Sequence, residues 1–196
     1  MTLPKTLRDH AGIAWPPANF DDAVLLLIDA QREYTDGNLR LHGIDTAVAA
    51  IARLLEKARR AGTPIVHVAQ NGRPGSALFD PEGPMSRFIP GIEPQAGETT
   101  IVKSLPNAFA KTELDAKLKA TGRSNLIFAG FMTHMCISTT ARVATDLGYR
   151  ATVVVEGTAT RDLPDGNGGV IDAATVQRVA LAELGDRFAT VVPQLI

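Results

Sequence analysis

Six short runs rich in apolar residues divide the chain, and each is predicted to form a β-strand; the first is typical of a strand that is buried on both faces. The clearest reads AVLLLI from Ala23 to Ile28 and is followed at once by Asp29. Another, Leu126 to Ala129, breaks at Gly130. The predicted strands are Ala23–Ile28, Pro64–Ala69, Thr99–Val102, Leu126–Ala129, Ala151–Val155 and Phe188–Val192.

Between these runs, apolar residues recur at intervals of three and four, which indicates amphipathic helices. The longest has basic residues in its last turns and stops at Gly62, and Thr112 is expected to cap the next one. The predicted helices are Thr46–Ala61, Thr112–Ala120, a segment running through Ile137 to Leu147 that ends at Gly148, and Asp172–Leu184.

Strands that alternate with helices predict an α/β fold, a Rossmann-like three-layer αβα sandwich around a mostly parallel sheet. A chain of 196 residues suits one core, so a single domain over 1–196 is expected. Residues 1–20 show no clear period and are predicted to form an N-terminal arm over the domain surface or a neighbouring subunit. Two segments rich in glycine and proline, 70–98 and 161–169, are expected to be functional loops.

Composition narrows the class of partner. The chain carries 20 basic and 21 acidic residues, a formal net charge of −1, so it lacks the basic surface that nucleic acid or anionic lipid requires. No run reaches the length that spans a membrane, and residues 1–20 lack the apolar core of a signal peptide. With only one cysteine, no internal disulfide can form. A cytoplasmic protein with a small-molecule partner is expected.

Candidate chemistry lies at the carboxyl ends of three predicted strands. Asp29 follows the first strand, Lys103 follows the third, and Cys136 stands where the helix after the fourth should begin. In a doubly wound sheet this edge is where ligands bind. A helix N-terminus and a nearby lysine are also expected to lower the pKa of the thiol.

Each of these residues has an ordinary structural explanation as well. A lone cysteine is often a small buried hydrophobe, Asp29 is also placed to cap the next segment or pair with Arg32, and a lysine leaving a strand is commonly just solvated. What favours catalysis is that all three types converge on one edge.

Three motifs carry a family resemblance. They are LLLIDAQREY around Asp29, GETTIVKSLPNAFAKTEL around Lys103, and GFMTHMCISTTARVATDLGYRATVVVEGTATRDL around Cys136. In this order the chain resembles the isochorismatase-like cysteine hydrolases, which include nicotinamidases and N-carbamoyl amide hydrolases. The resemblance covers most of the chain from Ala23 to about Leu184.

The resemblance implies an Asp29-Lys103-Cys136 triad and a six-stranded parallel sheet in the order 3-2-1-4-5-6. It also implies a cis peptide between Phe131 and Met132, with the amides of Met132 and Cys136 as the oxyanion hole. Relatives are commonly oligomers, so a homodimer or homotetramer is expected. His134 is expected to be non-catalytic. The candidates for lining the substrate pocket are Gln31, Tyr34, Phe109, Phe131 and Met132.

Such a triad suits the hydrolysis of a C–N bond in a small amide, imide or carbamoyl compound through a cysteine thioester. Two alternatives stay open. One is the hydrolysis of a vinyl ether, as in true isochorismatases, which needs no thiol nucleophile. The other is a non-catalytic relative that only binds a partner.

Neither a metal nor an organic cofactor is expected. Nicotinamidases place an Asp-x-His pair after the second strand, whereas this chain has Ala69-Gln70-Asn71-Gly72-Arg73 there. The four histidines are scattered, and none has ligand spacing with another His or Cys. A Gly-x-Gly-x-x-Gly turn is missing after the first strand, and a redox role would need a second cysteine.

Overall fold

The first apolar run of the sequence is the central strand, β1, of the computed structural model, which describes residues 3–195. Every side chain of β1 (Ala23–Ile28) is buried. The strand pairs in parallel with β2 (Ile65–Gln70) on one edge and with β4 (Asn125–Phe131) on the other. Such a strand meets protein on all sides, which explains why its sequence has no polar interruption.

The predicted α/β fold and its sheet order are confirmed. Six parallel strands lie in the order β3-β2-β1-β4-β5-β8, where β8 is the sixth strand of the expected 3-2-1-4-5-6 arrangement. The remaining strands are β3 (Thr99–Lys103), β5 (Arg150–Ala159) and β8 (Ala189–Val192). The chain order therefore reverses between β1 and β4, where Asp29 and Cys136 were predicted to meet.

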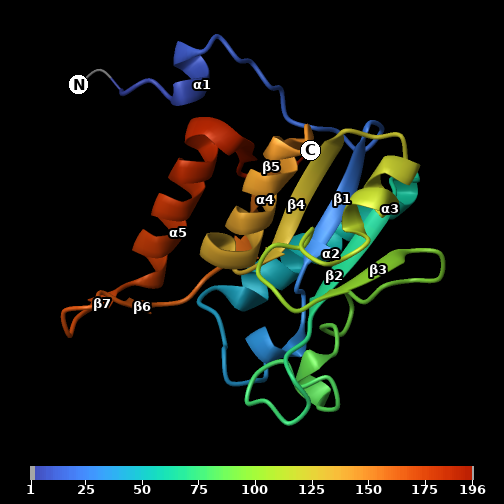
Figure 1. Ribbon diagram of the computed structural model, residues 1–196, viewed down its shortest axis with the longest axis vertical. Helices are drawn as coiled ribbons and strands as arrows, with labels where there is room; N and C mark the ends of the chain where they lie inside the picture. Colours follow the sequence, from blue (N-terminus) through green and yellow to red (C-terminus); the bar gives the residue numbers. More distant parts are fainter. Residues whose placement is uncertain (1–2, 196) are drawn as a thin grey trace.

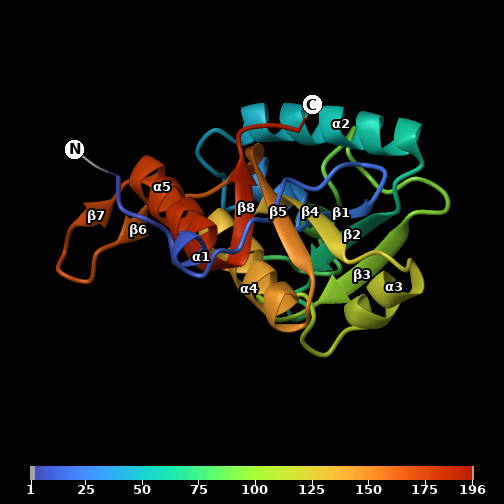
Figure 2. The ribbon, with the colours of Figure 1, turned by 90° about the horizontal axis from the view of Figure 1, so that it is seen from above.

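Helices cover both faces of this sheet (Figure 2). On one side lies α2 (Ile44–Ala61), and on the other lie α3 (Leu114–Ala120) and α4 (Ser138–Asp146), with α5 (Ala173–Glu183) packed beside the turn that follows β4. Leu25 and Leu27 of β1 face the α2 layer, and Val24, Leu26 and Ile28 face the opposite layer. The alternation of strand side chains thus divides one apolar run between two cores.

Two helix starts differ from the predictions. α2 begins two residues early, at Ile44, because this apolar side chain is buried against the sheet and Gly43 takes the N-cap position. α3 begins two residues late, at Leu114, with Glu113 as its N-cap. Thr112 is not the cap that we expected; its hydroxyl accepts a hydrogen bond from the amide of Leu114 at 3.2 Å within the turn before the helix.

The loop predicted over 161–169 contains a strand. β6 (Leu163–Pro164) pairs in antiparallel fashion with β7 (Val170–Ile171), and this small hairpin projects from the body of the molecule beside α5 (Figure 1). The other long segment, 70–98, contains one 3-10 turn, η2 (Pro84–Ser86). A second 3-10 turn, η1 (Arg32–Tyr34), follows β1.

The N-terminal arm lies along the β5 and β8 side of the sheet. It contains one helical turn, α1 (Leu7–His10), and Arg8 donates a hydrogen bond from Nη1 to the carbonyl of Ala189 at 2.7 Å. Further along, the amide of Ala18 donates to Oγ1 of Thr152 at 2.9 Å. A π-helical turn, η4 (Leu184–Phe188), joins α5 to β8. Among the helices of residues 3–195, none is long and apolar enough to cross a bilayer.

Candidate active site

The predicted triad comes from the carboxyl ends of three strands, β1, β3 and β4, at one edge of the sheet. Asp29 follows β1 directly, Lys103 is the last residue of β3, and Cys136 lies in a π-helical turn, η3 (Thr133–Ile137), just after β4. β2 separates β3 from β1, so the long side chain of Lys103 reaches across the end of β2 to the other two residues.

The geometry of the turn after β4 depends on Gly130. Its φ is +114°, and a Cβ atom there would lie 2.0 Å from the carbonyl oxygen of Ile28 in β1. No other residue permits so close an approach of the two backbones. Gly130 therefore brings the nucleophile turn against the end of β1, where Asp29 has an unusual positive φ of 53°.

The ammonium group of Lys103 is the centre of the site. Its Nζ lies 2.8 Å from Oδ2 of Asp29 and 3.3 Å from Sγ of Cys136. A third contact, 2.7 Å to Oε1 of Gln70, was not predicted. Gln70 is the last residue of β2, so the rule that identified Lys103 at the end of β3 would have identified Gln70 too.

Burial sets the electrostatics of this group. The side chains of Asp29 and Lys103 are both 0% exposed. Desolvation raises the pKa of Asp29, although the positive charge and the hydrogen bond of Lys103 oppose that rise. A carboxylate with a raised pKa is a better general base near neutral pH.

The expected lowering of the thiol pKa is wrong for the resting site. Burial, together with the negative charge of Asp29, raises the pKa of Cys136 to about 12, and Lys103 offsets only part of this. The sequence argument counted the lysine and the helix terminus but not the desolvation of a residue that is only 6% exposed. Cys136 thus rests as a protonated thiol beside a base.

The backbone around Met132 agrees with the arrangement that the resemblance implies. The peptide between Phe131 and Met132 is cis, and Met132 occupies the N-cap position of η3. Its carbonyl accepts hydrogen bonds from the amides of Met135 and Ile137, at 3.0 and 3.2 Å. Within residues 3–195 its own amide has no acceptor in the protein. The oxyanion-hole assignment to Met132 and Cys136 stays a prediction.

Tyr34 and Phe131 form an aromatic wall close to the triad. The ring of Tyr34 meets those of Phe79 and Phe131 edge to face, with centroids 5.3 and 5.6 Å away. Burial, and then the negative charges of Asp29 and Cys136, raise the pKa of Tyr34 well above its ordinary value. The ring therefore stays neutral, as suits a wall rather than a proton carrier.

Two other pocket candidates lie differently. Gln31 is buried, and its side-chain amide is hydrogen-bonded to backbone groups. Nε2 donates to the carbonyls of Gln70 and Ser86, at 2.9 and 2.6 Å, and Oε1 accepts from the backbone amide of Gln70 at 2.8 Å. Phe109 stacks on Tyr149, with centroids 6.0 Å apart, against the core on the α4 side. The part of Gln31 and Phe109 in lining the substrate pocket stays a prediction.

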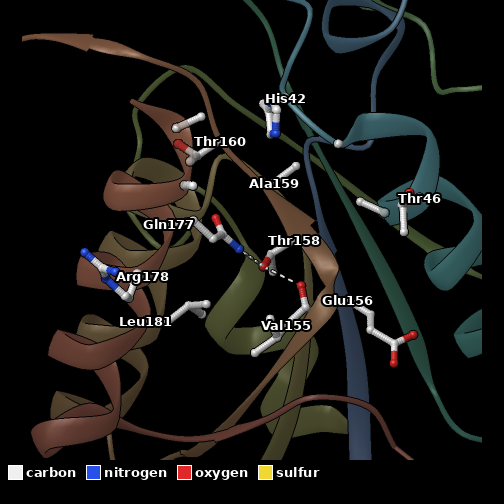
Figure 3. Close-up of a pocket in the computed structure, with 14 residues that line it drawn as sticks. His42, Thr46, Val155, Glu156, Thr158, Ala159, Thr160, Gln177, Arg178 and Leu181 are labelled. Carbon is white, nitrogen blue, oxygen red and sulfur yellow. Dashed lines mark hydrogen bonds between the residues drawn. The ribbon is translucent and has the colours of Figure 1, made fainter. Parts of the chain in front are cut away.

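His134 points away from the triad. Its Nδ1 is hydrogen-bonded to Oγ1 of Thr160 at the end of β5, and burial lowers its pKa, as does Arg161. Beyond Thr160 lies a hollow of about 600 Å³ between α5, the end of β5 and the start of α2 (Figure 3). There Gln177 donates from Nε2 to Oγ1 of Thr158 at 2.9 Å. None of the triad residues lines this hollow.

The described residues offer no group of three or more His, Cys, Asp or Glu side chains arranged to hold a metal ion. The end of β2, close to where a metal-binding relative would carry its ligands, supplies Gln70 to the lysine. Activity without metal stays a prediction.

Residues 23–193 match the model of the isochorismatase domain. The chain belongs to the isochorismatase family. A crystal structure of an isochorismatase from Pseudomonas putida KT2440 is 48% identical, covers 97% of both chains and superposes with a TM-score of 0.94. This similarity confirms the resemblance drawn from the three motifs.

Two relatives of this isochorismatase-family chain are similar along much of its length. The secreted isochorismatase effector Isc1 of Verticillium dahliae is 36% identical over 187 residues, which span 95% of this chain and 96% of the relative. The maleamate amidohydrolase of Pseudomonas putida is 35% identical over 148 residues, which span 67% of this chain and 70% of the relative. Hydrolase chemistry is therefore the activity that the family relationship supports.

Proposed function

We propose that this protein hydrolyses a C–N bond of a small amide, imide or carbamoyl compound through a thioester on Cys136. The observation that carries the proposal is the single ammonium group of Lys103, which contacts both a buried carboxylate, at 2.8 Å, and the only thiol of the chain, at 3.3 Å. The similarity to an amidohydrolase supports the bond type.

The first half of the reaction forms the thioester. Asp29 takes the proton of the Cys136 thiol as the sulfur attacks the substrate carbonyl carbon, so the negative charge passes from the carboxylate to the sulfur and then to the carbonyl oxygen. Lys103 lies beside both the carboxylate and the sulfur and stabilises each stage. The tetrahedral intermediate then collapses, the C–N bond breaks, and Asp29 returns the proton to the leaving nitrogen.

The second half releases the acid. Asp29, ionised again, deprotonates a water molecule that attacks the thioester carbonyl, and the C–S bond breaks to restore the thiol with the proton held by Asp29. In both halves the amides of Met132 and Cys136 are proposed to hold the oxyanion. This role suits the Met132 amide, which has no acceptor within the described part of the chain.

The proposed pocket is small and apolar beside the triad. Tyr34, Phe131 and Met132 supply its wall, each no more than 8% exposed. Gln31, which the sequence placed among the substrate contacts, has its amide engaged by backbone, so we assign it to the support of the site. A homodimer or homotetramer stays a prediction.

The test is a panel of small amides, imides and ureido compounds, assayed for released ammonia or amine. Rapid acid quenching of a turning-over sample should show, by mass spectrometry, an acyl adduct on Cys136. A Cys136→Ser variant should fold normally, form no thioester and lose turnover. Turnover that survives in this variant would reject the thioester route.

Vinyl ether hydrolysis is a second candidate. Its support is the 36% identity to a secreted isochorismatase effector along nearly the whole chain. Because that chemistry needs no thiol nucleophile, Cys136→Ser should retain it while losing amide hydrolysis. If isochorismate is cleaved equally by the wild type and the variant, and no amide is cleaved, the second candidate replaces the first. Because this relative is named a secreted effector, a cytoplasmic location for the present protein stays a prediction.

A further inference from the structure

Gln70 lies where two of the strands that build the site meet. It ends β2, and the register of the sheet places it directly beside Lys103 of β3. Its side-chain oxygen lies 2.7 Å from Nζ of Lys103, as near as the carboxylate of Asp29 at 2.8 Å. A neutral amide therefore contacts the catalytic ammonium as closely as the charged partner does.

The hydrogen-bonding capacity of Lys103 explains why a third contact is needed. An ammonium group has three N–H donors and no acceptor, and each donor that is buried without a partner costs free energy. The side chain of Lys103 is 0% exposed, so bulk solvent does not reach the third donor. Sγ of Cys136 and Oε1 of Gln70 accept hydrogen bonds from the ammonium, and Oδ2 of Asp29 lies at ion-pair distance, 2.8 Å.

Gln70 is itself held in place at three points. Gln31 binds both its backbone groups, accepting from the amide at 2.8 Å and donating to the carbonyl at 2.9 Å. The Nε2 group of Gln70 donates to the carbonyl of Asn71 at 3.1 Å, which turns Oε1 towards the lysine. The second donor bond of Gln31, to Ser86 at 2.6 Å, ties this arrangement to η2 in the long loop.

We propose that Gln70 is a positioning residue that keeps the Lys103 ammonium midway between Asp29 and Cys136, and that Gln31 acts on the nucleophile through Gln70. The inference rests on the proposed function and adds to it a residue outside the triad. During the reaction, negative charge moves between the carboxylate and the sulfur. The side-chain oxygen of Gln70 keeps the same charge throughout, so it holds the Lys103 ammonium in place while the ammonium stabilises first the carboxylate and then the sulfur.

The same argument explains why an amide, rather than a carboxylate, is suited to position 70. A glutamate would place a second carboxylate against the ammonium, which would compete with the sulfur for the cation and repel the thiolate. A methionine has similar length but offers no comparable acceptor, so the third N–H would be left unpaired. Both changes should make the thiolate harder to form, the glutamate more so.

The first experiment measures the pH dependence of Cys136 alkylation by iodoacetamide, which needs no substrate. We expect Gln70→Met to slow alkylation at pH 8 by about tenfold and Gln70→Glu to slow it more, with the apparent pKa of the reaction raised in both. Gln177→Met is the matched control, since Gln177 is a partly buried glutamine whose single bond goes to Thr158. Thermal unfolding establishes that each variant is folded.

A second experiment tests the route from Gln31. Gln31→Met should slow alkylation in the same direction, and the double variant Gln31→Met/Gln70→Met should be no slower than Gln70→Met alone, because both changes disturb one lysine. Additive effects would show that Gln31 acts independently and would overturn that part of the inference.

The two proposals fail in different ways. If both Gln70 variants reproduced the alkylation profile of the wild type while Lys103→Ala shifted it, the positioning role of Gln70 would be rejected and the triad would stand. Turnover retained by Cys136→Ser would instead reject the thioester mechanism. Should Gln70→Met fold poorly, Gln70→Glu decides the question alone, since it keeps an oxygen at the same position.

Discussion

β2 takes part in two buried charge networks that differ in purpose. At its carboxyl end, Gln70 joins the Lys103, Asp29 and Cys136 group. Three residues earlier, His67 bonds through Nε2 to Oε2 of Glu98 at 2.7 Å, and Arg59 of α2 donates to the same carboxylate at 2.7 and 3.1 Å. Both networks are ionic and link a strand to segments distant in sequence, but the triad is fully buried whereas Arg59 and Glu98 are partly exposed.

What separates them is the direction of the pKa shifts. Burial by itself would raise the pKa of Glu98, but hydrogen bonds from Arg59, the amide of Gln95 and His67 outweigh it and lower the pKa to about 2. In the triad the balance is reversed, because burial raises the pKa of Asp29 and of Cys136 and the single cation only partly offsets this. Glu98 is stabilised as an anion, whereas Asp29 and Cys136 remain able to exchange a proton.

The comparison teaches that buried charge alone does not mark a catalytic site. In the Glu98 network nearly every lone pair of the carboxylate is occupied, so it fastens the end of the long loop to α2 and β2. In the triad, Oδ1 of Asp29 meets no N–H or O–H donor in residues 3–195 and stays available to a proton. Four predictions test this difference.

The largest effect is expected at the nucleophile. Cys136→Ser should lower the turnover of a cleaved amide by about a thousandfold or more, because serine in the same place is a much weaker nucleophile. Met135→Ala is the control, since Met135 is on the same turn but 39% exposed, and it should keep near-native turnover. Equal losses in both variants would mean that the turn, rather than the thiol, is what the reaction needs.

The second prediction sets one carboxylate of each network against the other. Asp29→Asn removes the base without changing its size and should lower turnover by about a hundredfold, with little loss of stability. Glu98→Gln should leave turnover near native but lower the free energy of unfolding by roughly 1.5–3 kcal/mol, because charge-assisted hydrogen bonds are lost. Steady-state rates and urea titrations measure the two effects, and an exchange of phenotypes would refute the comparison.

The third prediction concerns the pH dependence of stability. Glu98 has a folded-state pKa of about 2 against an ordinary value of 4.5, so its contribution is fully present above pH 4.5 and is lost as the pH falls towards 2. The stability difference between the wild type and Glu98→Gln should therefore be constant from pH 7 to pH 5 and shrink below that. Urea unfolding at several pH values measures it. A difference that persists at pH 2 would assign the effect to packing instead.

The smallest expected effect is that of chelation, which should be none. The site provides one carboxylate, a lysine and an amide, and the positive charge of Lys103 opposes a cation. Prolonged dialysis against a strong chelator should leave turnover unchanged, with elemental analysis as the control for metal content. Activity that is lost on chelation and restored by zinc or manganese would show that a metal takes part.

The sequence alone was enough to predict the six strands of the sheet, although β4 and β5 extend past their predicted ends, to Phe131 and Ala159. Uninterrupted apolar runs such as AVLLLI are stable only between two helical layers, so the strand positions and the α/β class follow from local pattern. The carboxyl ends of parallel strands share one edge, which is why the sequence predicts that Asp29, Lys103 and Cys136 meet.

Only the tertiary structure decided how these residues are used. The reach of Lys103 across β2, its third bond to Gln70 and the assignment of Gln31 to backbone depend on distances between segments far apart in sequence. The pKa of Cys136 depends on how completely the folded chain removes water from it, which outweighs the lysine that the sequence displays. Pattern along a chain reports periodicity and order, whereas desolvation and hydrogen-bond pairing are properties of three-dimensional packing.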